Sequence, residues 1–219
     1  MVTPAAILWD MDGTLVDTEP YWIEAETELM RAHGLDWSHE QGLEFVGNDL
    51  LTSAGILRAA GLDLAPDVIV DRLLTAVISR VEVAVPFRPG ALEFLGAARA
   101  EGIPCMLVTA SYRSLAEAVV AACPPDSFVG IVAGDEVSAG KPDPEPYLTA
   151  AALLGLDPRD CAALEDSVPG LASAEAAGTI AVGIPHLVEL DPLPGRHLWS
   201  GLEGRSPADL RALRPRLSV

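Results

Sequence analysis

Short apolar runs that alternate with amphipathic stretches are the feature that most constrains the fold of this 219-residue chain. Five runs have the length of fully buried strands, at residues 5–9, 103–108, 129–133, 161–164 and 179–184. Stretches with helical spacing lie between and beside them, at residues 91–100, 114–122, 144–154 and 167–177. Strands that alternate with helices in this way predict right-handed βαβ units, and therefore an α/β fold with a doubly wound parallel sheet covered on both faces.

One long interval interrupts the alternation. From residue 18 to residue 86 the pattern is helical, with helices expected at residues 21–33, 39–45, 50–60 and 66–81. An interval of about 65 residues is far too long for a loop. We therefore predict an inserted all-α domain at residues 18–86 and an α/β core formed by residues 1–17 and 87–219. A last helix is expected at 207–213, whereas the Pro- and Gly-rich segment 185–206 has no clear pattern.

The composition limits which binding partners and which cellular compartment we expect for the protein. The chain carries 32 Asp and Glu against 14 Lys and Arg, a formal net charge of -18, so it lacks the basic footprint that a nucleic acid or an anionic membrane surface requires. No apolar run is long enough for a signal peptide or a membrane span. The three cysteines form no metal-binding pattern and are expected to be buried hydrophobes. These features predict a soluble, cytoplasmic protein, which we expect to be a monomer, with a dimer left open.

Polar side chains gather where the predicted strands end. The residues that follow successive strands are Asp10 and Asp12, then Thr109 and Ser111, then Lys141, and finally Glu165 and Asp166. Because ligands of open parallel sheets bind at the carboxyl ends of the strands, we expect these side chains to meet. Oxygen ligands suit a hard cation, most naturally Mg²⁺, which takes phosphate oxygens as further ligands. The set therefore indicates phosphoryl transfer, and the only lysine of the chain falls within it.

Motifs of this kind resemble those of a known family. The D-M-D-G-T stretch that begins at Asp10 resembles the first motif of the haloacid dehalogenase-like hydrolase superfamily. Thr109, Lys141 and the pair Glu165 and Asp166 are similar to its second, third and fourth motifs, in order and spacing over nearly the whole chain. The helical insertion resembles the cap of the phosphoglycolate phosphatase and β-phosphoglucomutase branch. The resemblance implies a Rossmann-like core with a cap that closes over it.

The resemblance also implies a role for each motif residue. Asp10 would attack phosphorus to give an aspartyl-phosphate. Asp12 would act as general acid to the leaving oxygen and then as general base to water. Mg²⁺ would bind the Asp10 carboxylate, the Asp12 backbone carbonyl and Asp166, with Glu165 close by; whether Glu165 is a ligand or a structural neighbour stays open. Lys141 would neutralise charge on the phosphoryl group in transit.

Substrate contacts are expected from the core and from the helical insertion. In the core, Thr109, the Ala110 N–H group, Ser111 and Lys141 would hold the phosphoryl oxygens. The candidate contacts in the insertion are Glu19, Trp22, Gly47 and Asn48, the last two in a turn that resembles the family's substrate loop. Three arginines are considered as further anion contacts, namely Arg58, Arg72 and Arg113.

Two activities and one non-catalytic role stay open for a chain of this kind. Asp12 argues against a haloalkanoic acid dehalogenase, and an insertion without lysine argues against a phosphonatase that forms a Schiff base there. Sugar phosphomutases place a histidine just after the first motif, whereas the first histidine here is His33. We therefore expect a Mg²⁺-dependent phosphatase of a small, sugar-phosphate-like metabolite. A β-phosphoglucomutase-type phosphomutase is the alternative, and a non-catalytic binding or regulatory protein is a remote one.

Overall fold

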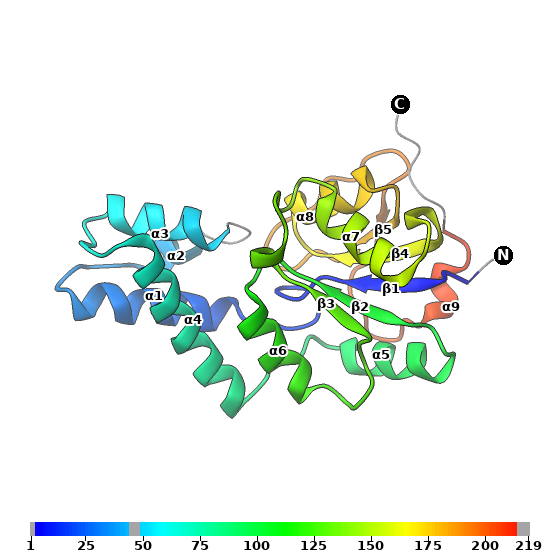
Figure 1. Cartoon of the computed structure of the whole chain (residues 1–219), viewed down its shortest axis with the longest axis horizontal. Coiled ribbons are helices and arrows are strands. Elements are labelled where there is room, and N and C mark those ends of the chain that lie inside the picture. The colour runs from blue at the N-terminus through cyan, green and yellow to red at the C-terminus, as the bar shows by residue number, and fades with distance from the viewer. Residues whose placement is uncertain (1–2, 44–48, 214–219) are drawn as a thin grey trace.

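Figure 1 shows the computed structural model, which describes residues 3–43 and 49–213. An α/β part is built on one sheet, and a block of helices lies to one side of it, at the left of Figure 1. Over these described ranges, no helix combines the length and the apolar character that crossing a membrane requires.

The sheet has six parallel strands in the order β3-β2-β1-β4-β5-β6. The strands are β1 (Ala6–Trp9), β2 (Cys105–Val108), β3 (Gly130–Val132), β4 (Cys161–Glu165), β5 (Ile180–Gly183) and β6 (His197–Leu198). β1 lies between β2 and β4, with Ile7 opposite Cys105 and Leu8 opposite Ala163. All four residues of β1 are buried, which explains why its sequence is an unbroken apolar run. The predicted α/β fold with a parallel sheet is confirmed.

Helices cover both faces of the sheet. They are α5 (Ala91–Ala100), α6 (Arg113–Ala122), α7 (Glu145–Leu154), α8 (Val168–Ala176) and α9 (Pro207–Leu210), with the short 3-10 helices η1 (Gly134–Glu136) and η2 (Pro158–Asp160). Successive residues of β1 belong to different cores because strand side chains alternate between faces. Trp9 packs edge-on against Phe94 of α5, with ring centroids 5.5 Å apart. Leu8 belongs to a second core with Tyr147 of α7 and Leu171 of α8.

A block of helices, four of them in the residues that the structure describes, lies between β1 and α5 in the sequence and is here called the helical block. It consists of α1 (Glu19–Ala32), α2 (His39–Leu43), α3 (Leu50–Ala59) and α4 (Pro66–Val83), so the helices expected in this interval are present. Their apolar faces bury residues such as Met30, Leu57 and Ile69. The two connections to the sheet run side by side, because the Asp17 N–H group donates to the Pro86 carbonyl at 2.8 Å. The chain therefore leaves and re-enters the α/β part at one place.

The C-terminal segment differs most from expectation. Residues 197–198 form the edge strand β6, which pairs with β5 through His197 opposite Val182. A two-residue strand in a Pro- and Gly-rich segment gives too little periodicity to be predicted. The last helix ends at Leu210 rather than at residue 213. The three cysteines are free and buried, as predicted.

Candidate functional site

The carboxyl ends of β1, β2 and β4 meet at one edge of the sheet, where a cleft of about 720 Å³ opens toward the helical block. The α/β part supplies to its wall six of the residues predicted from sequence: Asp10, Asp12, Ala110, Ser111, Lys141 and Asp166. The helical block supplies Glu19 and Trp22. Two predicted contacts, Gly47 and Asn48, lie outside the described residues. Residues far apart in the sequence thus share one cavity.

Lys141 is the centre of a buried network of charges. Its side chain is only 6% exposed, and Nζ lies 2.7 Å from Asp10 Oδ1 and 2.6 Å from Glu165 Oε1. Nζ also donates a hydrogen bond of 2.9 Å to the Val108 carbonyl. Burial alone would lower the pKa of Lys141, but the charges of Asp10 and Glu165 raise it well above its ordinary value. The side chain therefore remains a cation.

Glu165 is the fully buried partner of Lys141 on β4. It accepts a hydrogen bond of 2.5 Å from the Tyr147 hydroxyl and one of 3.3 Å from Ser167 Oγ. Burial raises the pKa of Glu165, Asp10 adds to the rise, and Lys141 opposes it. A Cβ atom at Gly170 would lie 2.0 Å from Glu165 Oε2, so the approach of α8 depends on glycine at this position. Glu165 thus fixes Lys141 in place.

Three carboxylates could hold a metal ion. Asp10, Glu165 and Asp166 each offer an oxygen, and these oxygens lie within 4.8 Å of one another. Asp10 Oδ2 is buried and has no hydrogen-bond partner among the described residues. Burial raises the pKa of Asp166 to about 9, and the charges of Asp10 and Glu165 add to the rise. A divalent cation fits this set, because it takes oxygen ligands and offsets the repulsion between buried carboxylates.

Gly13 determines how closely the loop after β1 approaches the carboxylates. Its φ is +88°, in the left-handed region that glycine adopts readily. A Cβ atom at this position would lie 1.9 Å from Asp166 Oδ2. Any side chain here would therefore push the Asp166 carboxylate out of the cluster.

Asp12 is held by three hydroxyl groups. It accepts hydrogen bonds from Thr18, from Ser111 Oγ at 2.8 Å and from Thr109 Oγ1 at 3.3 Å. Thr109 is buried and does not line the cleft, and its Oγ1 also accepts a hydrogen bond from the Ser111 N–H group. Burial raises the pKa of Asp12, the Thr18 hydrogen bond opposes the rise and Asp10 adds to it. A positioned carboxyl group with a raised pKa suits proton transfer.

Seven polar residues at or near the cleft are not among the site residues predicted from the sequence, namely Thr18, Glu26, Asp49, Ser53, Ser138, Tyr147 and Ser167. Tyr147 lies on a predicted helix, where an aromatic side chain is expected to pack in the hydrophobic core. Asp49 carries a detectable local signal, because its side chain accepts hydrogen bonds from two N–H groups in the first turn of α3. That signal predicts a helix start and says nothing about a cleft.

The arginines considered as anion contacts do not reach the cleft. Arg113 forms an ion pair with Glu136, with Nη2 2.6 Å from Oε2. Arg58 and Arg72 are exposed on the helical block and line no part of the cleft. Among the described lining residues, Lys141 has the one cationic side chain.

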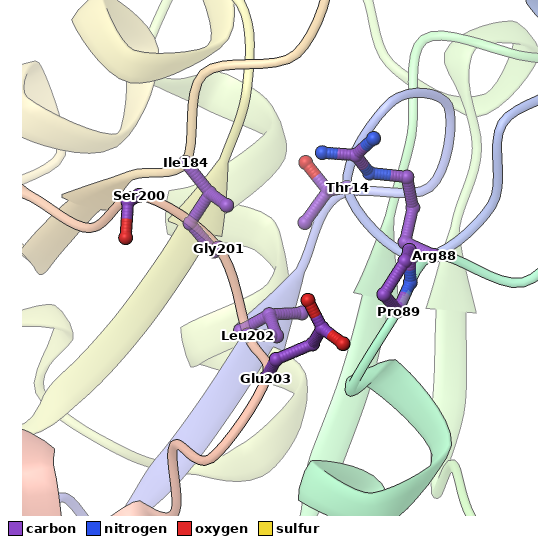
Figure 2. Close-up of a pocket in the computed structure, with 8 residues that line it drawn as sticks. All are labelled: Thr14, Arg88, Pro89, Ile184, Ser200, Gly201, Leu202 and Glu203. Carbon is purple, nitrogen blue, oxygen red and sulfur yellow. The ribbon is translucent and has the colours of Figure 1, made fainter.

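A second, smaller pocket of about 100 Å³ lies beside the two connections between the sheet and the helical block (Figure 2). Its lining residues are Thr14, Arg88, Pro89, Ile184 and residues 200–203. Thr14 Oγ1 is buried and has no hydrogen-bond partner in the described parts of the chain. His186 contacts both connections, with ring nitrogens 2.5 Å from Arg88 Nη1 and 2.9 Å from Asp17 Oδ1. The C-terminal segment thus braces these connections, and the pocket contains none of the clustered carboxylates.

Comparison with known proteins gives one consistent family. A family model described as haloacid dehalogenase-like hydrolase matches residues 4–178. The chain is 34% identical to hexitol phosphatase B of Escherichia coli strain K12 over 192 residues, or 84% of this chain and 86% of that protein. It is 38% identical to protein CbbY of Rhodobacter capsulatus over 82% of this chain and 85% of that protein. The crystal structure of CbbY from Rhodobacter sphaeroides in complex with phosphate superposes with a TM-score of 0.85, at 27% identity over 94% of this chain and 99% of that one.

Proposed function

Because the chain belongs to the haloacid dehalogenase-like hydrolase family, we propose that its cleft hydrolyses a phosphate monoester with Asp10 as nucleophile and Mg²⁺ as cofactor. The protein is a phosphatase, and its substrate is a small phosphorylated, sugar-phosphate-like metabolite. The assignment of residues rests above all on Asp10. One carboxylate oxygen of Asp10 is bound by Lys141, and the other is buried with no hydrogen-bond partner among the described residues. Asp10 also belongs to the cluster of carboxylates with Glu165 and Asp166.

The reaction divides into two displacements at phosphorus. In the first, a carboxylate oxygen of Asp10 forms a bond to phosphorus while the bond to the ester oxygen breaks, and Asp12 donates its proton to the departing alkoxide. In the second, water bonds to phosphorus while Asp12 takes a proton from that water, and the bond between phosphorus and Asp10 breaks. The products are the alcohol and inorganic phosphate. Burial raises the pKa of Asp12, so its carboxyl group is protonated more readily than a carboxyl group in water.

The remaining polar residues hold the phosphoryl group. The Ala110 N–H group, Ser111 and Lys141 lie on or beside the cleft wall and would contact its oxygens, while Thr109 supports Ser111 from behind. Asp10, Asp166 and the Asp12 backbone carbonyl would bind Mg²⁺, with Glu165 as a neighbour. When bound, Mg²⁺ supplies positive charge that offsets repulsion between the nucleophile and the phosphate.

The helical block would act as a cap over this chemistry. We assign residues 18–86 to a cap domain and residues 1–17 and 87–219 to the catalytic core. Support comes from the paired connections at residues 17 and 86, which form one narrow joint between the two parts. Closure around such a joint would exclude water from the cleft and bring Glu19 and Trp22 onto the leaving group.

The decisive experiment assays hydrolysis of p-nitrophenyl phosphate with Mg²⁺ by the wild type and by Asp10→Asn. We expect turnover by the wild type, none by the variant and none with EDTA. Equal rates for the two proteins would refute the assignment of Asp10. A phosphomutase would instead interconvert sugar 1- and 6-phosphates without net release of phosphate, and that outcome would replace hydrolysis as the main activity.

A further inference from the structure

The helical block forms one wall of the cleft, and this wall, here called the roof, contains no cationic side chain among the residues that the structure describes. The polar residues of the roof are Glu19, Glu26, Asp49 and Ser53. The other residues are apolar or aromatic, such as Trp22 and Leu73. The described part of the roof thus offers carboxyl and hydroxyl oxygens on an apolar background, and no positive charge to pair with a second phosphate or a carboxylate.

The cationic side chains of the helical block make their contacts elsewhere. Arg80 lies 2.9 Å from Glu24 Oε2 and 2.8 Å from Glu28 Oε2. Arg72 is exposed and lines no part of the cleft. The residues at 44–48, which the structure does not describe, read Glu-Phe-Val-Gly-Asn in the sequence and contain no base. An anionic group on the leaving side of the substrate would therefore be desolvated without a counter-charge.

Glu26 is the most deeply buried carboxyl group of the roof. It is 3% exposed and lines the cleft, and its Oε2 atom is buried without a hydrogen bond of normal geometry in the described residues. Burial raises the pKa of Glu26 to about 8, a hydrogen bond with the Trp37 indole opposes the rise, and the charge of Glu19 adds to it. A carboxyl group in either protonation state can pair with a hydroxyl group, as donor or as acceptor. The indole has a single N–H group, whereas a carboxyl group can make several hydrogen bonds, so Glu26 keeps the capacity to pair with hydroxyl groups of a ligand in the cleft.

We propose that the cleft is specific for a monophosphate whose leaving group is an uncharged polyhydroxylated carbon chain, with hydroxyl groups of that chain paired to Glu26 and to the neighbouring oxygens of the roof. This inference rests on the proposed phosphatase function and narrows its substrate. The cleft volume of about 720 Å³ lies in the range of roughly 300–1,000 Å³ that is typical of small-molecule sites. Leaving groups with a carboxylate or a second phosphate are disfavoured.

The first test compares phosphate monoesters with and without a second anionic group on the leaving side. Sorbitol 6-phosphate and 6-phosphogluconate have the same carbon chain, but the second ends in a carboxylate instead of a hydroxymethyl group. We expect the wild type with Mg²⁺ to have a kcat/KM for sorbitol 6-phosphate at least about 10²-fold above that for 6-phosphogluconate or fructose 1,6-bisphosphate, by analogy with other sites that discriminate through buried polar groups. Equal or reversed preference would overturn the inference.

The second test assigns the preference to Glu26. Glu26→Ala should lower kcat/KM for sorbitol 6-phosphate about 10–100-fold more than it lowers kcat/KM for p-nitrophenyl phosphate, whose leaving group has no hydroxyl chain. Glu26→Gln retains a hydrogen-bonding group and should restore most of the ratio. The matched control is Glu24→Ala, on the same helix but exposed to solvent, which should leave the ratio unchanged. An equal loss for both substrates would show that Glu26 has only a structural role.

The two proposals fail in different ways. If no ester is hydrolysed, p-nitrophenyl phosphate included, the phosphatase function is refuted and the specificity with it. If p-nitrophenyl phosphate is hydrolysed but the anionic substrates are preferred, the phosphatase function stands and the specificity alone is refuted. Circular dichroism of each variant excludes misfolding as the cause of a changed ratio, and the comparison of substrates on the wild type needs no variant.

Discussion

Replacement of Lys141 by methionine removes one positive charge from between two buried carboxylates and keeps most of the side-chain volume. The side chains of Lys141, Asp10 and Glu165 are 6%, 9% and 0% exposed. Removing one member of such a buried pair costs about 3–5 kcal/mol, because the other charge is left without compensation. At about 2–4 °C per kcal/mol for a chain of this length, we expect Tm to fall by about 6–20 °C when no metal is present.

The size of this loss should depend on pH. Burial and the charge of Asp10 already raise the pKa of Glu165, and Lys141 opposes the rise, so the variant should have a higher value still. A carboxyl group whose pKa is higher in the folded than in the unfolded protein lowers the free energy of unfolding at pH values where it is ionised in both states. That cost is relieved as pH falls through the folded-state pKa and the folded protein takes up a proton. The deficit of Lys141→Met should therefore shrink between about pH 8 and about pH 5.

The measurement is thermal and urea unfolding of both proteins in EDTA at several pH values. Arg159→Met serves as the control, because Arg159 and its partner Asp157 have side chains that are 75% and 41% exposed, and such surface pairs contribute only about 0–1 kcal/mol. Addition of Mg²⁺ should restore part of the stability of Lys141→Met by replacing some of the missing charge. A deficit no larger than that of the control, or one that does not change with pH, would contradict charge neutralisation as the role of Lys141.

Three further variants test other parts of the site. Gly13→Ala should raise the Mg²⁺ concentration for half-maximal activity about 10–100-fold, measured by metal titration, because its Cβ atom displaces Asp166. Asp12→Asn should lower kcat about 10²–10⁴-fold in a phosphate-release assay, and a smaller loss would argue against proton transfer by Asp12. Thr14→Val removes a buried, unpartnered hydroxyl group from the pocket in Figure 2, so urea unfolding should show an unchanged or higher free energy of unfolding. Destabilisation by more than about 1 kcal/mol would mean that this hydroxyl has a partner.

Sequence alone predicts the arrangement of the residues that follow strands. Asp10, Lys141 and Asp166 are far apart in the chain, but each follows a predicted strand of one parallel sheet. Since the carboxyl ends of such strands share an edge, the topology brings these side chains together without any knowledge of packing. The apolar runs predict the strands themselves because both faces of the sheet are covered. This part of the site is a consequence of local patterns.

The side chains that contact those residues come from other parts of the chain, and local sequence patterns could not predict these contacts. Tyr147 reaches Glu165 from α7, and Glu26 reaches the cleft from the middle of α1. Both sit at helical positions where a buried side chain is expected, and only the tertiary packing decides whether a buried polar atom meets a partner or a cavity. Arg113 shows the converse, because its place at a helix start suggested an anion contact but Glu136 binds it.

The clustered charges explain why an acidic protein can bind an anionic substrate. The net charge of -18 opposes the approach of a phosphate ester at long range. Inside the cleft, the ammonium of Lys141 is already matched by Asp10 and Glu165, so it does not by itself create a positive site. With every group ionised, the three carboxylates of the cluster and this one ammonium leave two negative charges, which a divalent cation would cancel. We therefore expect the cleft to accept a phosphate group only when the metal ion is bound. The charge of the site depends on Lys141, the three carboxylates and the metal ion together.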